Sequence, residues 1–172
     1  MLKKIRERMQ DDQGFTLIEL MVVVLIIAIL IAIAIPTFLG LRRRAQDRAA
    51  QSDLRNGLTN AKAFFADDEA YTNATPANLN AQEPSLTFQA AASALPTPLE
   101  VSMEVSTTNA TTVDDTWSAA RLSGSGTCFY IRDVGSSSPV VGGTFYGDNA
   151  GAVTPCTGAA ATNPANTPNR SW

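Results

Sequence analysis

The chain has 172 residues, which is enough for one domain or for one domain with an appended segment. Thirteen Lys and Arg against sixteen Asp and Glu give a net charge of -3, which argues against a general nucleic-acid coat, because such proteins carry a large positive excess. The chain has no histidine and two cysteines, so Ser-His and Cys-His nucleophile pairs and most zinc sites are excluded.

The first strong feature in chain order is a run of sixteen apolar residues from Leu20 to Ile35. Extended to 15–41, the segment contains Glu19 as its only charge. As a helix it is about 40 Å long, which is enough to cross a hydrocarbon core of about 30 Å. Because the core helix of a soluble protein rarely stays apolar on every face, the run predicts a membrane or export segment.

The charges on either side of this segment are nearly balanced. Basic residues precede it at Lys3, Lys4, Arg6 and Arg8, and follow it at Arg42, Arg43, Arg44, Arg48 and Arg55. The positive-inside rule therefore does not orient the segment. A basic N-terminus ahead of an apolar run is typical of exported chains, and two cysteines in a polar domain suit an oxidising exterior. We expect the region after the run to lie outside the cytoplasm.

Three interpretations of the N-terminus are open on these residues. In the first, Ala32-Ile33-Ala34 is the cleavage site of an ordinary secretory signal. In the second, the segment is an uncleaved membrane anchor. In the third, the chain is cut after Gly14, where the charged leader meets the apolar run.

Glu19 favours the third interpretation. A carboxylate inside an apolar helix costs a few kcal/mol unless it is paired, and no basic residue lies within a helical turn or two of it. A cut after Gly14 creates an amino group on Phe15, four positions before Glu19. In a bundle of identical staggered helices, the carboxylate of one subunit meets the amine of the next, and a wrong register leaves that charge unpaired.

The arrangement Lys3-Lys4, Gly14-Phe15-Thr16-Leu17-Ile18-Glu19, the long apolar run and Pro36 resembles the N-terminus of type IV pilins and pseudopilins. The resemblance implies a prepilin peptidase that cuts between Gly14 and Phe15 and methylates Phe15. It also implies that Glu19 acts in filament assembly and that Pro36 kinks the helix, since proline removes a backbone donor and clashes with the preceding turn. Its implied partners are copies of itself, an assembly platform with minor pilins, and membrane lipid before assembly.

After the apolar run, an apolar stripe predicts a second half of the same helix. Its members, Ala50, Leu54, Leu58, Ala61 and Phe65, recur at helical spacing. We expect one helix over 15–66, packed by its second half on a head domain, with Asn56-Gly57 as a softer bend. The arginines at 42–44 are expected to contact lipid headgroups rather than DNA.

The rest of the chain predicts a small β domain. The proline-rich segment 67–98 reads as an irregular connector with a short helical piece near 88–95. Alternating residues predict a strand over 99–105, and two further strands, 116–122 and 127–133, flank the turn at 123–126. A weaker strand is expected within 140–146. With 1–14 as leader and 99–172 as an antiparallel head, the fold class is α+β, as the resemblance also implies.

Cys128 and Cys156 are expected to form one disulfide in an exported head. Closing that loop stabilises the head by roughly 3–4 kcal/mol on the chain-entropy model. The resemblance implies that the bridge pins the C-terminal region.

Together these observations predict a filament subunit rather than an enzyme, with no cofactor, metal or specific nucleic acid. The precursor is expected in the cytoplasmic membrane with its head outside, and the processed form in an extracellular pilus. Two alternatives are open: a pseudopilin of a type II secretion or DNA-uptake system, and a membrane-anchored binding module that does not polymerise. The sequence fits adhesion, motility, DNA uptake and secretion equally.

Overall fold

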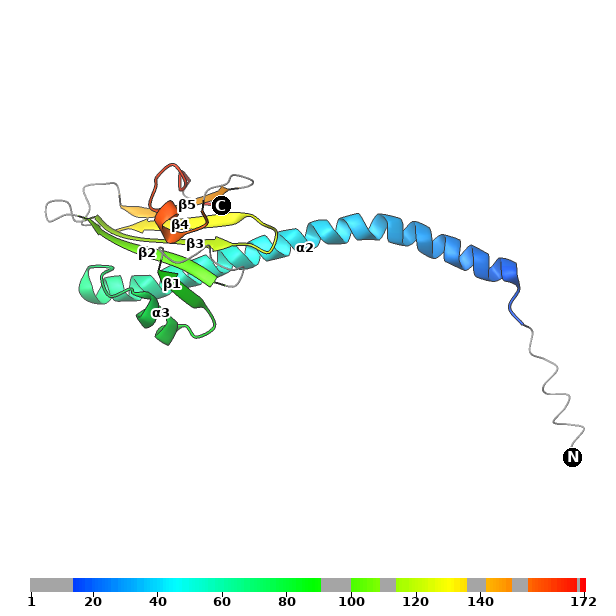
Figure 1. Cartoon of the computed structure of the whole chain (residues 1–172), viewed down its shortest axis with the longest axis horizontal. Helices are drawn as coiled ribbons and strands as arrows, with labels where there is room; N and C mark the ends of the chain where they lie inside the picture. Colours follow the sequence, from blue (N-terminus) through cyan, green and yellow to red (C-terminus); the bar gives the residue numbers. More distant parts are fainter. Residues whose placement is uncertain (1–13, 91–99, 109–113, 136–141, 150–154, 170) are drawn as a thin grey trace, which may run out of the picture. The chain divides into compact units, whose positions relative to one another are not determined.

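The computed structural model describes residues 14–90, 100–108, 114–135, 142–149, 155–169 and 171–172. The chain divides into two compact units, Met1–Arg42 and Arg43–Trp172, which are described separately below. Helices are α2 (Leu17–Asp68), α3 (Pro76–Gln82) and α4 (Gly158–Ala161). Strands are β1 (Thr87–Ala90), β2 (Glu100–Thr108), β3 (Asp114–Leu122), β4 (Cys128–Val134) and β5 (Gly143–Asn149) (Figure 1).

The long helix α2 begins two residues later than expected from the sequence and ends two residues later. Leu17 follows an N-terminal turn closed by Thr16, and Asp68 precedes Glu69, whose φ of 54° is left-handed. A left-handed residue after the last helical turn is a common way to end a helix, although glycine is the usual choice there. The predicted continuity of the helix through the polar half is confirmed.

The second half of α2 packs on the sheet through the predicted stripe. Ala50, Leu54, Leu58 and Ala61 are buried, and Phe65 is half-buried against the same core. Gly57, expected as a bend, is instead buried inside the continuous helix. A Cβ there would lie 2.9 Å from Cε1 of Phe88, so the missing side chain lets the helix approach β1 closely.

The five strands form one sheet in the order β1-β2-β3-β4-β5. All neighbours are antiparallel except β1 and β2, which are parallel. The predicted turn at 123–126 joins β3 to β4, with Gly126 at φ +92°, a left-handed value that suits glycine. The first three strands expected from the sequence are present as β2, β3 and β4, and the α+β class is confirmed. The fourth, expected within 140–146, appears as β5 over Gly143–Asn149; residues 140–141 lie outside the described part of the chain.

The segment expected to be irregular, 67–98, contains two regular elements that the sequence analysis did not predict. Helix α3 starts at Pro76 behind the N-cap Thr75, a favourable arrangement because proline at the first helical position lacks only a donor that would be unused. Residues 87–90 form β1 rather than the start of the predicted helical piece near 88–95; residues 91–95 lie outside the described part of the chain.

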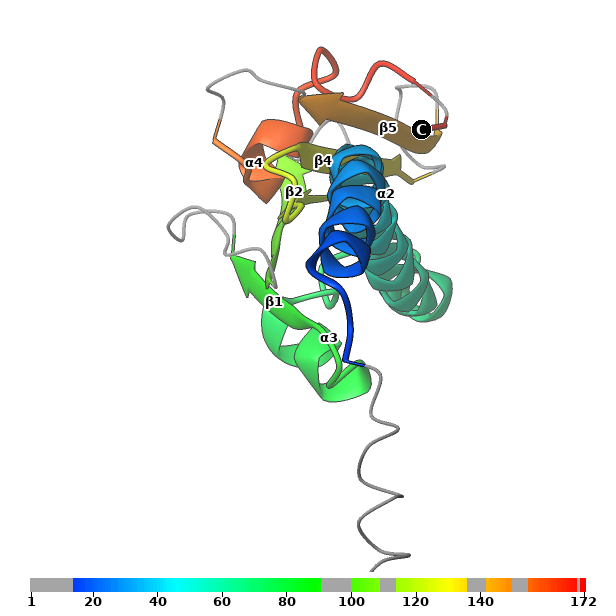
Figure 2. The same ribbon diagram turned by 90° about the vertical axis from the view of Figure 1, so that its right-hand side faces the viewer.

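The sheet is covered on both faces. Met103, Trp117, Phe129 and Ile131 share a core cluster with α2. The alternate residues of β3 and β4, including Ala120 and Tyr130, form a second cluster with Cys156 and α4. Every residue of β4 is buried; the apolar run 128–131 predicts this for the first four, whereas the burial of the charged Arg132 and Asp133 was not predicted. Figure 2 shows the second half of α2 and α4 on opposite sides of the strands.

Candidate functional site

The predicted cleavage position lies just outside the helix. Gly14, Phe15 and Thr16 precede α2, and all three are exposed. Phe15 is 87% exposed, and a Cβ added to Gly14 would meet no atom within 4 Å. The Gly14–Phe15 peptide bond is therefore accessible in a non-helical segment, which is the form in which a peptidase can bind a substrate backbone.

Thr16 and Glu19 form a reciprocal cap at the start of α2. The backbone N–H and the hydroxyl of Thr16 donate to Glu19 Oε2 across 2.9 and 2.6 Å, and the N–H of Glu19 donates to Thr16 Oγ1 across 3.3 Å. This is a capping box, in which a Thr and a Glu three residues later satisfy two donors of the first turn. The capping role of Thr16 was not predicted, although the pattern Thr16-Leu17-Ile18-Glu19 is the usual sequence signature of a capping box.

The capping box gives Glu19 a neutral partner, and among the described residues no ion pair to Glu19 is present. The carboxylate is oriented toward the backbone N–H of Thr16 at the helix start. The structure brings together Gly14, Phe15, Thr16 and Glu19 within the first described turn. Both hydrogen bonds that Thr16 donates are accepted by the same carboxylate oxygen of Glu19, Oε2.

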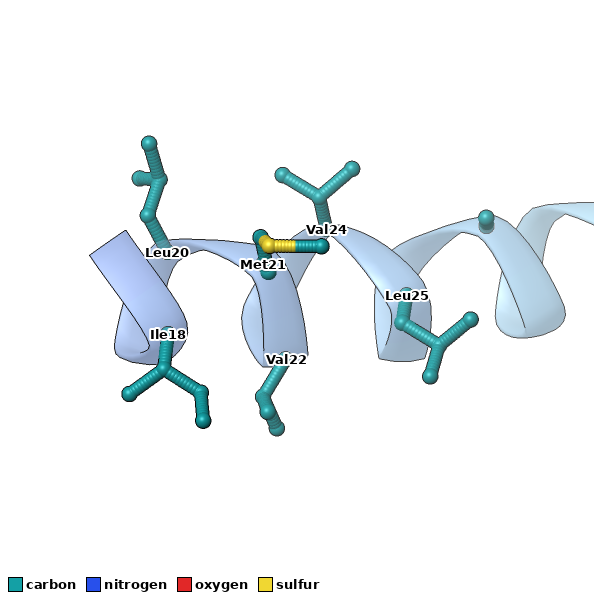
Figure 3. Close-up of a pocket in the computed structure, with 7 residues that line it drawn as sticks. Ile18, Leu20, Met21, Val22, Val24 and Leu25 are labelled. Atoms are coloured by element: carbon teal, nitrogen blue, oxygen red, sulfur yellow. The ribbon is translucent and has the colours of Figure 1, made fainter.

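The first unit presents an apolar surface on all sides. Nineteen large apolar side chains between Phe15 and Leu41 are each 48% or more exposed. In Figure 3, Leu20 and Val24 point to one side of the helix, and Ile18, Val22 and Leu25 point to the other. The helix is long and apolar enough to span a membrane, and its most apolar stretch has no buried residue within the chain. Such a surface requires lipid or other apolar helices around it.

Pro36 lies inside α2 rather than at its end. Its ring nitrogen cannot donate to Ala32, and the neighbouring Thr37 hydroxyl donates to the carbonyl of Ile33 across 3.2 Å. A threonine bonded to the carbonyl four residues earlier often accompanies a helix bend. The kink at Pro36 stays a prediction, and Thr37 is a second residue that favours a bend at this point.

Within the second unit, the start of the polar half of α2 is tied to the β3–β4 turn. The carboxylate oxygen Oδ1 of Asp47 accepts hydrogen bonds from the hydroxyls of Ser123 and Ser125 across 2.6 and 2.5 Å. Six residues further along the helix, Asp53 makes an ion pair with Arg121 of β3. Burial raises the pKa of Asp53, with the nearby Arg121 guanidinium opposing that shift.

A second tie lies near the end of the helix and centres on Asp133 of β4. Its Oδ2 accepts a 2.5 Å hydrogen bond from the Tyr71 hydroxyl, and its Oδ1 accepts one of the same length from the Thr144 hydroxyl. Lys62 of α2 lies 3.0 Å from Oδ1. Burial, and then the hydrogen bond to Asp133, raise the pKa of the Tyr71 hydroxyl far above its usual range.

The predicted disulfide between Cys128 and Cys156 is present, with a Cα–Cα distance of 5.7 Å. It joins the start of β4 to the segment that leads into α4. There the backbone N–H of Gly158 donates to the Ser102 hydroxyl across 3.0 Å, and the Ser118 hydroxyl donates to the carbonyl of Gly158 across 3.1 Å. The bridge and these hydrogen bonds hold the C-terminal region on the sheet face opposite α2.

No metal centre emerges from the residues that the structure describes, since no three His, Cys, Asp or Glu side chains are grouped to hold one. The features that stand out in the described residues are the exposed peptide bond between Gly14 and Phe15 and the apolar surface of the helix.

Comparison with known proteins gives a family match in this same N-terminal region and several relatives that match part of the chain. A family model described as the prokaryotic N-terminal methylation motif matches residues 9–35. The type IV major pilin protein PilA of Myxococcus xanthus is 45% identical over 62 residues, 36% of this chain and 28% of the relative. The type IV wide pilus major component PilA4 of Thermus thermophilus is 40% identical over 65 residues, 38% of this chain and 50% of the relative.

A fimbrial protein of Pseudomonas aeruginosa is 45% identical over 69 residues, 40% of this chain and 45% of that protein. The chain therefore spans half or less of the length of these curated relatives. No solved structure matches it significantly. The chain carries the N-terminal methylation motif of prepilins over residues 9–35, is similar over 36–38% of its length to two type IV pilus major components, and combines its long apolar helix with a pilin-like α+β head.

Proposed function

We propose that the chain is a structural subunit of a type IV pilus-like filament. The observation that carries this proposal is the surface of residues 15–41, which is apolar on every side and is left uncovered by the rest of the described residues. Before assembly, lipid surrounds that surface, so the precursor sits in the cytoplasmic membrane with its head outside. In the filament, the corresponding helices of other copies take the place of lipid.

Processing precedes assembly in this proposal. A prepilin peptidase hydrolyses the accessible Gly14–Phe15 bond, which leaves a carboxylate on Gly14 and an amine on Phe15, and the amine is then methylated. An assembly platform and minor pilins complete the set of partners. The role is structural, in keeping with the printed names of the relatives, which describe pilus components.

The amine freed at Phe15 is the countercharge that Glu19 lacks. In a staggered bundle, the Glu19 carboxylate of one subunit pairs with the Phe15 amine of a neighbour, because inside apolar surroundings an unpaired charge is costly. Apolar contacts supply the attraction between helices, and the charge pair selects the register.

The first test is the mass and N-terminal sequence of the protein from membranes and from sheared surface material. We expect sheared filaments composed mainly of a chain that starts at N-methylated Phe15. A start at Ile35 would show ordinary secretion without the assembly helix, and an intact Met1 in every fraction would show a plain anchor. Either result would overturn the proposal, and a processed chain present only in traces would favour a pseudopilin.

A matched pair of glycine variants sharpens this test. An added side chain meets no atom within 4 Å at Gly14 or at Gly40, so Gly14→Val and Gly40→Val both leave the subunit's own packing unchanged. We expect Gly14→Val to retain residues 1–14 and Gly40→Val to be processed normally. Normal processing of Gly14→Val would contradict the assigned cleavage position.

A further inference from the structure

The polar half of α2, within the second unit, carries charges of opposite sign at its two ends. Its start holds three arginines, which we call the basic start: Arg43, Arg44 and Arg48. Its end, together with the residue that follows the helix, holds three carboxylates, which we call the acidic end: Asp67, Asp68 and Glu69. All six side chains are exposed. Among the described residues, none of the six makes an ion pair.

All three charged residues between these two ends already have partners within the head. Asp53 makes an ion pair with β3, Lys62 makes one with β4, and Arg55 lies over the ring of Trp172. Asp47, beside the basic start, accepts hydrogen bonds from hydroxyls of the β3–β4 turn. In this half of the helix, unpaired charge is therefore confined to the basic start and the acidic end.

The acidic end lies where the helix itself disfavours negative charge. The last turn of a helix presents unbonded carbonyl oxygens and the negative end of the macrodipole, so basic residues are favoured there. The last turn of α2 contains no basic residue. Asp68 accepts a hydrogen bond from the side-chain amide of Asn73 across 2.7 Å, which brings no countercharge. This placement points to a basic partner that the described part of the chain does not supply.

The basic start has the chemistry of that partner. A guanidinium group binds a carboxylate through two parallel hydrogen bonds, and three exposed arginines match three exposed carboxylates in number and in sign. Within one chain the two ends cannot meet, because Arg48 and Asp67 are 19 residues apart on one continuous helix, which is about 29 Å. The match can therefore be made only between two copies.

We infer that the basic start of one copy docks on the acidic end of the copy below it in the filament. The two copies are parallel and displaced by the 24 residues that separate Arg44 from Asp68, which is about 36 Å along the helix. Each copy has one basic start and one acidic end, so the contact is heterologous and propagates instead of closing as a dimer. This inference rests on the proposed function, since it adds a contact between heads to the contact between apolar helices.

This contact does not compete with the contacts between the apolar helices. Segment 15–41 is about 40 Å long, so two copies displaced by about 36 Å share very little of it side by side. Copies with smaller displacements cover that segment, and one of them supplies the Phe15 amine that pairs with Glu19. Before assembly, lipid phosphates neutralise the basic start at the end of the membrane segment. In the filament, the acidic end of another copy takes the place of those phosphates.

Two charge-reversed chains test the contact in full-length protein expressed in a filament-forming host. The basic start is reversed in Arg43→Glu/Arg44→Glu/Arg48→Glu, and the acidic end in Asp67→Lys/Asp68→Lys/Glu69→Lys. Each chain alone places like charges in the contact, so we expect each to lower the recovery of sheared filaments about fivefold or more. Asp148→Lys, a reversal at an exposed residue of β5, is the control and is expected to leave recovery unchanged.

Co-expression of the two reversed chains distinguishes this contact from other effects of the substitutions. The start of each reversed chain is complementary to the end of the other, so the two chains can alternate in one filament. We expect co-expression to restore recovery to within about twofold of the unmodified chain, with both chains present in similar amounts. Neither a folding defect nor a lost contact with lipid is repaired in this way.

Cysteine crosslinking tests the displacement without reversing any charge. In this arrangement, residue 44 of one copy lies opposite residue 68 of the next. The two native cysteines are already bonded to each other, so added thiols can be read separately. In oxidised filaments, Arg44→Cys/Asp68→Cys is expected to give a ladder of covalent oligomers, while either substitution alone gives monomers.

The outcomes separate this inference from the proposed function. Normal recovery of both reversed chains, or no ladder from the double cysteine variant, would overturn the docking while the filament itself stood. Loss of filaments in the chain with the reversed basic start, without rescue by co-expression, would show that the arginines serve lipid only and would also overturn it. Absence of filaments from the unmodified chain would instead refute the proposed function.

Discussion

Tyr71 and Asp133 join the loop after α2 to the middle of the sheet through a buried hydrogen bond of 2.5 Å. Tyr71 has no exposed surface, and Asp133 is also buried. Because Asp133 also binds Thr144 and Lys62, one carboxylate holds the end of the helix, the following loop and β5 in place. The head is thus held to its helix by a polar network as well as by an apolar stripe.

Replacing Tyr71 by Phe removes one hydrogen bond to a charged acceptor and should lower the free energy of unfolding by about 1.5–3 kcal/mol at neutral pH. The measurement is urea denaturation of the detergent-solubilised full chain, followed by tryptophan fluorescence. Thr72→Val, a change at the exposed neighbouring residue, is the control. Equal stability of Tyr71→Phe and the unmodified protein would show that this hydrogen bond is not stabilising.

Tyr71 also predicts that the folded protein loses stability at alkaline pH. Its pKa in the folded protein is raised far above the ordinary value of 10.0, so above about pH 10 the unfolded chain loses the phenolic proton while the folded chain keeps it. Stability should then fall with rising pH by about 1.4 kcal/mol per unit more than in Tyr71→Phe. Denaturation midpoints from pH 8 to 11 check this, and parallel curves for the two proteins would contradict it.

Removing the disulfide should destabilise the head by roughly 3–4 kcal/mol, since it frees the loop between Cys128 and Cys156 in the unfolded state. We expect Cys128→Ala/Cys156→Ala to unfold at lower urea than the oxidised protein. Reduced unmodified protein provides the comparison, because it lacks the bond but keeps both side chains. Equal denaturation midpoints for all three forms would show that the disulfide does not stabilise the head.

Gly158 should tolerate no side chain. A Cβ there would lie 2.5 Å from the carbonyl carbon of Met103 and 2.6 Å from the nitrogen of Glu104. Both atoms belong to the backbone of β2, so a side chain at Gly158 fits only if α4 moves away from the sheet. We expect Gly158→Ala to cost about 1–3 kcal/mol, against a near-neutral effect of Ala159→Ser at the exposed neighbour. A thermal melt of each protein distinguishes the two.

Glu19→Ala should leave the head folded and the precursor inserted in the membrane, but lower its incorporation into filaments beside unmodified subunits. Thr16→Ala is the informative companion, because it removes the capping box and keeps the Glu19 charge. We expect Thr16→Ala to retain most of its incorporation. Equal losses in the two variants would assign Glu19 a capping role only, and normal incorporation of Glu19→Ala would refute the register argument.

Periodic features of the sequence predicted the fold well. The stripe from Ala50 to Phe65 reports burial directly, and the helix forms where expected. The alternation around Val101 locates β2, but its polar face is covered as well, since Ser102 is 2% exposed and bonds to Gly158 of α4. Short elements that depend on tertiary contacts were missed. The four-residue strand β1 forms by parallel pairing with β2, with Thr87 opposite Glu100, and α4 is four residues held by Thr157 and the sheet.

The candidate site shows the same division. Gly14, Phe15 and Glu19 were found because a local motif contains them, and Thr16 was within reach of the same motif. Asp47, Tyr71 and Asp133 carry no local signal, since each has its role through a residue more than sixty positions away. Gly57 was interpreted as a bend from helix propensity alone. In the structure, the ring of Phe88 lies so close that a side chain at this position would collide with it.

In each of the two edge strands of the sheet, backbone groups are hydrogen-bonded by other residues of the same chain. The side-chain amide of Asn80 both donates to and accepts from the backbone of Phe88 in β1, across 3.0 and 2.7 Å. At the other edge, Tyr146 of β5 exchanges two backbone hydrogen bonds with Asn169. An exposed sheet edge is a template to which a strand of another chain can add, as in amyloid. At Phe88 and Tyr146 the backbone groups of the two edges are already paired within the head, so strand addition by another chain is blocked at these two positions.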